Sequence, residues 1–270
     1  MSRQTIRLSP TSAMHYAKLV YRSVLFLLAV GLYIRERTRY PFTFAAERVR
    51  YSVILTVIWG VYAAEMLLRF FPAALESPGC QKIFRRNYLP VPDARPDRKR
   101  MDRGLGWVIL SWVALNGAMG ALYLLKVIDW GILLLLSLAY GICDMVCILF
   151  FCPFQTWFMK NKCCGTCRIY NWDYAMMFTP LVFVPAGYTW SLFGLGLALL
   201  IEWEIIYARH PERFDEVSNG TLRCENCTEK LCHHKKQLQR FLKKYRHLIR
   251  IPLPPLPGHK SGRSEGPQRP

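Results

Sequence analysis

Acidic residues are scarce in this 270-residue chain, which has 18 Asp and Glu against 36 Lys and Arg and therefore a net charge of +18. A pI near 9.7 often accompanies nucleic-acid binding, but here the basic residues gather in segments that border long apolar blocks. The excess of Lys and Arg on the cytoplasmic side of membrane proteins explains this distribution more simply. We therefore expect no nucleic-acid partner.

Signatures of soluble enzymes are also missing from the chain. It contains no P-loop, no Rossmann glycine pattern, no HExxH and no GxSxG, and each of these motifs would have pointed to a defined chemistry. We also find no internal repeat. These absences leave no reaction to assign and favour a protein that is not an enzyme.

Long apolar blocks are the main feature that is present. Hydrophobic residues make up 52% of the chain and the mean hydropathy is +0.12. About 20 apolar residues are needed to cross a ~30 Å hydrocarbon layer, and three blocks are long enough for one span each, namely 52–71, 105–127 and 131–151. A fourth block is long enough for two helices, which we place at 175–188 and 190–207. Pro180 and Pro185 should kink the first of these two.

The first apolar segment, 24–34, is the weakest candidate for a span. A basic flank before a short apolar run also fits a signal peptide, but no small-residue cleavage site follows. We expect an uncleaved signal anchor whose Lys18 and Arg22 reach the lipid headgroups. The sequence thus predicts an all-α, polytopic membrane helix bundle of about six spans, or five if this first segment lies in the interface.

The charge distribution orients this predicted bundle. Six spans place both termini on one side, together with most of the Lys and Arg residues, so we expect both termini to be cytoplasmic and the membrane to be a bacterial inner membrane. The loop 35–50, which carries five arginines, is the exception to this rule.

Composition divides the chain into six parts. They are a membrane hairpin at 1–71, a cytoplasmic Pro- and Arg-rich linker at 72–104, a four-span bundle at 105–207 that includes a cysteine loop at 152–173, a Cys/His cluster at 208–234, a basic amphipathic helix at 235–250 and a disordered tail at 251–270. We expect the amphipathic helix to bind anionic lipid at the surface of the bilayer.

Two cysteine clusters flank the last predicted hairpin. Cys164 with Cys167, and Cys224 with Cys227, are CxxC pairs, a spacing that aims two thiolates at one metal ion. Because a helical hairpin returns the chain to the same side of the membrane, the two pairs can meet. We expect a cytoplasmic four-thiolate site that holds structural or regulatory zinc. The spare candidate ligands are Cys152, Cys163, Cys232, His233 and His234.

The same cysteines allow other functions. An iron–sulfur cluster is the alternative cofactor, although the ferredoxin spacing C-x2-C-x2-C-x3-C-P is absent. A reactive dithiol at Cys164 and Cys167 is also possible, since Lys160, Lys162 and Arg168 are compatible with a lowered thiol pKa. Either alternative would make the chain a membrane redox protein. The simplest alternative is that the thiols bind no ligand.

Four acidic residues lie inside the predicted spans: Asp144, Glu65, Glu202 and Glu204. Asp144 is the most informative of these residues for function, because a charge at that depth usually faces the bundle interior or a water path. For Glu65 we expect an ion pair with Arg69, four residues later on the same helix. A transporter that moves an ion or small solute with Asp144 is therefore a further alternative. Hydrogen bonding between helices is the simpler explanation.

Overall fold

The computed structural model describes residues 9–39, 53–72, 76–161, 163–227 and 229. Within these residues the secondary structure is helical, and the only strand-like feature is an isolated antiparallel bridge between Pro90 and Asn219. The prediction of an all-α fold is confirmed. The segments at 235–250 and 251–270 lie outside the described residues.

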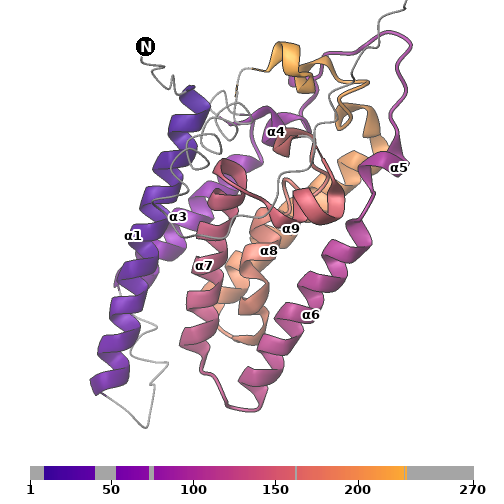
Figure 1. The fold of residues 1–270 in the computed structure, drawn as a ribbon. Coiled ribbons are helices and arrows are strands. Elements are labelled where there is room, and N and C mark those ends of the chain that lie inside the picture. Colours follow the sequence, from indigo (N-terminus) through magenta and orange to yellow (C-terminus); the bar gives the residue numbers. More distant parts are fainter. Residues whose placement is uncertain (1–8, 40–52, 73–75, 162, 228, 230–270) are drawn as a thin grey trace, which may run out of the picture.

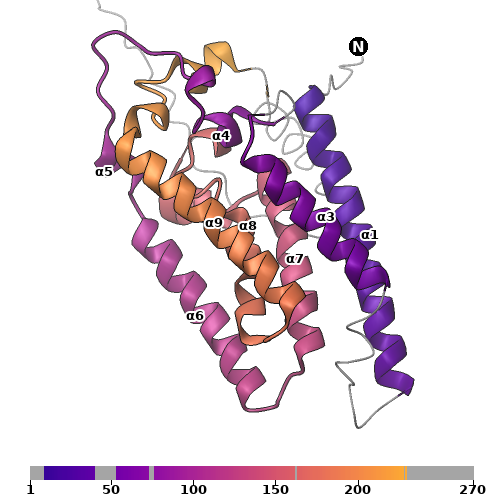
Figure 2. The ribbon, with the colours of Figure 1, turned by 180° about the vertical axis from the view of Figure 1, so that it is seen from behind.

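Four helices in the described part are long and apolar enough to cross a membrane. They run alongside one another in Figures 1 and 2. They are α1 (Pro10–Arg39), α6 (Leu105–Leu124), α7 (Trp130–Leu149) and α9 (Gly187–Arg209). Their outward faces are apolar, as lipid requires, and large side chains such as Leu27, Trp107 and Val113 are exposed on them.

Helix α1 corrects the prediction for the first segment. It is 30 residues long, far longer than the apolar run at 24–34, because it continues through Lys18 and Arg22. These two side chains point into the protein and not away from it. The Arg22 side chain is 0% exposed and the Lys18 side chain 14% exposed, and both face carboxylates of other helices.

Two of the six predicted spans are shorter than the four long helices. Helix α3 (Val53–Arg69) has 17 residues. The predicted helix 175–188 is instead α8 (Asp173–Phe178) followed by a 3-10 helix at Thr179–Phe183. Pro180 stands at the start of that 3-10 helix, where its missing N–H is tolerated. Four of the predicted spans are thus long apolar helices, and the prediction of six spans is not confirmed in the described part of the chain.

The short α8 segment is packed inside the bundle. Tyr174, Phe178 and Leu181 are each 1% exposed and share a core with Tyr62 of α3 and Leu138 of α7. Gly196 of α9 allows this close approach, since a Cβ there would lie 3.1 Å from the carbonyl oxygen of Tyr174. Irregular backbone in an apolar environment is tolerated when protein surrounds it, and residues 173–181 are all buried or half-buried.

Three parts of the chain outside the long helices gather at the end of the bundle where α1 begins (Figure 1). We call this end the cap; it comprises residues 76–103, 152–161 with 163–172, and 210–227. Its two short α-helices are α4 (Pro78–Gln81) and α5 (Arg98–Met101). Arg213 Nη1 donates to the Ile83 carbonyl at 2.7 Å, and Arg100 pairs with Asp215. The linker and the segment after α9 thus fold together.

Candidate functional site

A cavity of about 120 Å³ lies where α6, α7 and α8 meet the cysteine loop. Five cysteines from α7 and the loop line it, together with two carboxylates, Asp144 and Asp173. The five are Cys143, Cys147, Cys152, Cys164 and Cys167. Aromatic and thioether side chains complete the wall, so the cavity is apolar and rich in sulfur.

Local structure explains how the thiols converge. Cys143 and Cys147 are four residues apart and therefore share one face of α7. After α7 ends, a π-helix at Phe154–Met159 turns the chain back, and the 3-10 turn at Cys164–Thr166 presents Cys164 and Cys167 to the same space.

Gln155 and a pair of thiols connect the two sides of the cavity. The side chains of Cys147 and Cys152 are hydrogen-bonded to each other. The backbone N–H of Gln155 donates to Cys152 Sγ at 3.4 Å, and Cys164 Sγ donates to Gln155 Oε1 at 3.1 Å. Three thiols from separate parts of the chain are therefore linked within one short network.

Burial governs the ionisation of the loop thiols. It raises the pKa of Cys167 to about 12, and it does the same for Cys80, which packs beside the loop. A protonated thiol is a poor nucleophile. The lowered pKa that a reactive Cys164–Cys167 dithiol would need is therefore not found at Cys167.

Lys82 is a residue of this site that sequence reasoning missed. Its ammonium donates to the carbonyls of Gly165 at 3.1 Å and Cys167 at 3.3 Å, and it lies 5.0 Å from the Trp203 ring centroid. Burial lowers its pKa to about 8. Nothing in the sequence distinguishes one lysine of a polar linker as a buried residue. Only the fold shows that Lys82 supports the CxxC turn.

Arg168 ties the same turn to α9. Its guanidinium pairs with Asp102 and Glu204 and lies 3.6 Å from the Tyr207 ring centroid. Trp172 Nε1 also donates to Glu204 at 2.8 Å. Glu204 is thus a structural partner of the cysteine loop, whereas Glu202 lines a separate small pocket with Arg69.

A cluster of buried charges lies directly behind the cavity. We call it the charge cluster, and its members are Lys18, Arg22, Glu65, Arg69, Glu76, Asp144 and Asp173. Arg22 is at its centre. Its Nη1 lies 3.2 Å from Asp144 Oδ2 and donates to the Gly141 carbonyl at 3.0 Å, while its Nη2 lies 3.1 Å from Glu65 Oε2.

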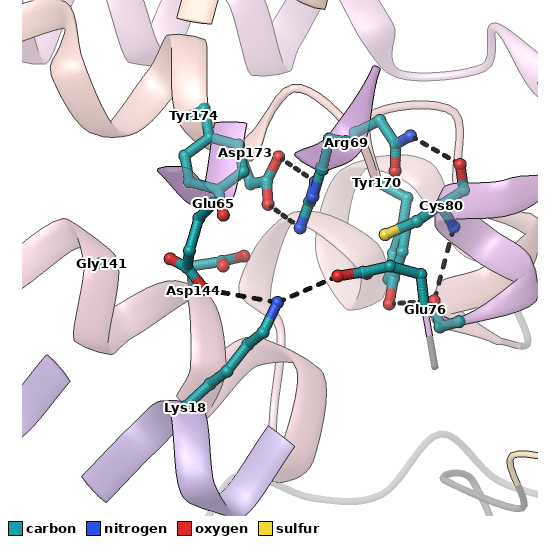
Figure 3. Close-up of polar contacts among 12 residues, drawn as sticks. Lys18, Glu65, Arg69, Glu76, Cys80, Gly141, Asp144, Tyr170, Asp173 and Tyr174 are labelled. Atoms are coloured by element: carbon teal, nitrogen blue, oxygen red, sulfur yellow. Dashed lines mark hydrogen bonds and ion pairs between the residues drawn. The ribbon is translucent and has the colours of Figure 1, made fainter. Parts of the chain in front are cut away.

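Figure 3 shows the rest of the charge cluster, with Lys18 between the carboxylates of Glu65 and Glu76. Arg69 faces Asp173 through two contacts, at 2.9 and 2.8 Å. The predicted Glu65–Arg69 pair is therefore wrong. A bidentate carboxylate on α8 satisfies the buried guanidinium better than a neighbour on the same helix, and this leaves Glu65 for the cations of α1.

Glu76 stands at the cap end of this cluster, outside the long helices. Burial opposes its ionisation, but Arg69 and Lys18 outweigh that effect and lower the pKa of Glu76. The charge cluster thus extends from the cavity wall at Asp144 to the cap. It holds four carboxylates against three cationic side chains, a formal excess of one negative charge within the cluster itself.

The predicted ligands separate into two places. Cys164 and Cys167 are buried at the cavity, while Cys224 is exposed and Cys227 half-buried around the 3-10 turn at Cys224–Asn226, away from the cavity lining. Of the spare candidates, Cys152 lines the cavity and Cys163 is half-buried beside it. Cys232, His233 and His234 lie outside the described residues.

No ready-made multidentate metal site is visible in the part of the chain that the structure describes. There, no three His, Cys, Asp or Glu side chains are grouped so that they could hold a metal ion. The closest approach to such a group is the thiol pair of Cys147 and Cys152 with Cys164 across Gln155.

Comparisons with known proteins add no relative. No protein-family model, curated protein or solved structure matches this chain. Functional inference therefore depends on the cavity, the charge cluster and the apolar helices.

Proposed function

We propose that this chain is an integral membrane protein that binds a thiophilic metal ion in the cysteine-lined cavity. The observation that carries the proposal is the convergence of five cysteines from α7 and the loop on one cavity. Thiolate sulfur favours zinc, Cu(I) and iron–sulfur clusters over hard cations. Zinc is the ion that the sequence led us to expect.

The membrane part of the proposal follows from the helices and the charges. Four helices are long and apolar enough to cross a bilayer, and the short α3 and α8 segments would complete six crossings if protein and not lipid surrounds their ends. The cap holds most of the described Lys and Arg residues, so it should face the cytoplasm of a bacterial inner membrane. The start of α1 lies at that end (Figure 1).

A carboxylate in the cavity wall supports a cation as the ligand. The Asp144 side chain lines the cavity and is 18% exposed, while the Lys82 ammonium supplies a positive charge at the CxxC turn. Metal binding would also release the thiol protons that burial retains, because a coordinating thiol is deprotonated by the ion.

The proposed ligands differ from the set that the sequence suggested. Cys164 and Cys167 are retained, and Cys147 and Cys152 replace Cys224 and Cys227 as the second pair, because only the former line the cavity. A metal ion there would bind α7 to the cysteine loop. The original set, with both CxxC pairs, would instead bind the loop to the tail.

Elemental analysis of matched variants tests this choice. The protein is purified anaerobically in mild detergent as wild type, as Cys147→Ser/Cys152→Ser and as Cys224→Ser/Cys227→Ser, and metal per chain is measured after zinc loading. We expect about one ion in the wild type and in the tail variant, and none in the cavity variant. Loss in the tail variant alone would restore the original ligand set, and zero binding in all three would overturn the proposal.

A membrane redox protein is the second candidate, and the contact between Cys147 and Cys152 favours it. Two adjacent thiols can lose two protons and two electrons to a quinone, giving a disulfide and a quinol. Alkylation before and after addition of a water-soluble quinone should then show the loss of two reactive thiols. An iron–sulfur cluster would be recognised instead by visible absorbance and acid-labile sulfide in the same preparation.

A further inference from the structure

The cavity is lined by sulfur of two kinds. Besides the five thiols, the thioethers of Met176 and Met177 face it. Met177 is 1% exposed, and its Sδ would lie 3.2 Å from a Cβ placed at Gly141 of α7. No histidine is among the lining residues. Thioether ligands bind soft ions and contribute little to zinc sites, which use thiolate, imidazole and carboxylate.

The arrangement of the thiols also limits the coordination number. Tetrahedral zinc needs four ligands, and even a catalytic zinc site supplies three from the protein. No three-ligand group exists among the described His, Cys, Asp and Glu side chains, yet Cys147 and Cys152 are in direct contact. Two sulfurs, with a third as an option, suit a monovalent d¹⁰ ion, whose preferred coordination is linear or trigonal.

We propose that the natural ligand of the cavity is a soft monovalent cation of the Cu(I) type, held by Cys147 and Cys152 with a thioether from Met176 or Met177. This inference rests on the proposed function and narrows it to one class of ion. No redox step is required, since the ion arrives and remains as Cu(I). Each thiol that coordinates gives its proton to solvent.

The surroundings of the cavity suit such an ion. Trp112 and Phe154 form an apolar wall with the sulfurs, and an apolar, sulfur-rich wall suits a soft ion better than a hard one. The carboxylate of Asp144 in the cavity wall would attract a monovalent or a divalent cation. The softness of the ion and its coordination number therefore distinguish Cu(I) from zinc.

The first experiment is a metal competition in detergent. Wild-type protein is titrated anaerobically with Cu(I) held by bicinchoninate, and separately with zinc in the presence of a zinc-indicator dye. Ag(I) serves as a monovalent ion that cannot be oxidised under these conditions. We expect one Cu(I) or Ag(I) per chain to be taken from the chelator, and zinc to be bound at least about tenfold less tightly, a difference of 1.4 kcal/mol.

Variants locate the ion. Cys147→Ser/Cys152→Ser should lose Cu(I) binding by more than the roughly 10- to 100-fold typical of a changed outer-shell partner. Met176→Leu/Met177→Leu should weaken Cu(I) without changing zinc. The Cys224→Ser/Cys227→Ser protein is the matched control and should bind as the wild type does. X-ray absorption at the copper edge should show two or three sulfur neighbours.

The outcomes separate this inference from the proposed function. Zinc bound in the cavity with no Cu(I) preference would overturn the inference and leave the proposed function standing. Failure of both ions to bind would overturn both. Cu(I) binding that survives Cys147→Ser/Cys152→Ser would place the ion elsewhere and would also overturn the inference.

Discussion

The charge cluster and the cysteine cavity are neighbours that share Asp144 and Asp173, yet their polar groups are used differently. In the charge cluster each cationic head group meets at least one carboxylate within 3.4 Å. In the cavity the thiols interact with one another and with Gln155, and space for a further atom remains. The charges of the first region are paired within it, although the Nε atoms of Arg22 and Arg69 have no hydrogen-bond partner among the described residues. The second region keeps open space beside its thiols.

This difference indicates which region is structural and which can accept a ligand. Buried charges are tolerated only when paired, so the charge cluster is expected to hold α1, α3, α7 and α8 together. Thiols are weak donors and acceptors, so exchanging their present contacts for contacts with a ligand costs little. The main role of Asp144 is therefore to pair with Arg22. This role weakens the case for a transporter in which Asp144 binds the transported ion or solute.

Removal of Arg22 should have the largest effect on stability. Arg22→Met leaves Glu65 without one partner and Asp144 without its only cationic contact at this distance. Breaking a buried pair typically costs about 3–5 kcal/mol. The measurement is the thermal unfolding midpoint in detergent, followed by fluorescence-detected size exclusion.

Arg35→Met on the same helix is the control for Arg22→Met. The Arg35 side chain is 67% exposed and pairs only with its neighbour Glu36, so we expect less than about 0.5 kcal/mol. Equal midpoints for the two variants would show that the charge cluster does not stabilise the bundle, and the contrast with the cavity would disappear.

The Arg69–Asp173 pair should come next. Asp173→Asn removes the charge of the bidentate partner of Arg69 and should cost about 2–3 kcal/mol, because the guanidinium remains buried. Arg69→Met should cost a similar amount. The double variant should cost less than the sum of the two, since each single change leaves one uncompensated charge. Strict additivity would contradict the pairing.

The sequence was sufficient for the general class of fold but not for its details. Apolar blocks predicted α6 and α7 to within a few residues, because a span is set by local composition. The apolar blocks did not predict the length of α1, where Lys18 and Arg22 interrupt the apolar pattern and are neutralised by carboxylates of α3, α7 and the cap. They also failed at 175–188, where burial by other helices permits a break that composition alone does not reveal.

Some residues of the candidate site could be predicted from the sequence and others could not. Cys164 and Cys167 were found from their CxxC spacing, and Asp144 from its depth. Cys143, Cys147, Met176 and Met177 were not, because cysteine and methionine in an apolar helix look like ordinary core residues. A usable signal was present in the charges, since Lys18 and Arg22 four residues apart on an apolar helix require carboxylates from other spans.

Lys82 should give a pH-dependent effect of about 1 kcal/mol. Its folded pKa of about 8 lies below the unfolded value of 10.5, so between these values the unfolded chain binds more protons and raising the pH favours the fold. Between pH 8 and 9 this gain is about 1 kcal/mol. The thiols of Cys80 and Cys167 oppose it above their unfolded value of 9.0.

A comparison of Lys82→Met with the wild type isolates this effect, because both proteins keep the thiols. The variant should lose stability relative to the wild type by about 1 kcal/mol between pH 8 and 9, as measured by unfolding midpoints. Lys99→Met, at an exposed position of α5, should track the wild type. A constant gap across this range would show that Lys82 is not held at a low pKa.

We expect the smallest effect on stability from substitutions in the cavity. This measurement decides whether the cavity, unlike the charge cluster, is free of a structural role. Cys147→Ser/Cys152→Ser keeps side-chain volume nearly unchanged and removes no ion pair, so the unfolding free energy should change by less than about 1 kcal/mol, while metal binding is lost. The same sample is used for both measurements, with Cys224→Ser/Cys227→Ser alongside. A loss as large as that of Arg22→Met would show that the thiols hold the bundle together without any ligand. A small loss together with abolished metal binding would mean that these thiols serve a ligand, since the packing around α7 would then be intact without them.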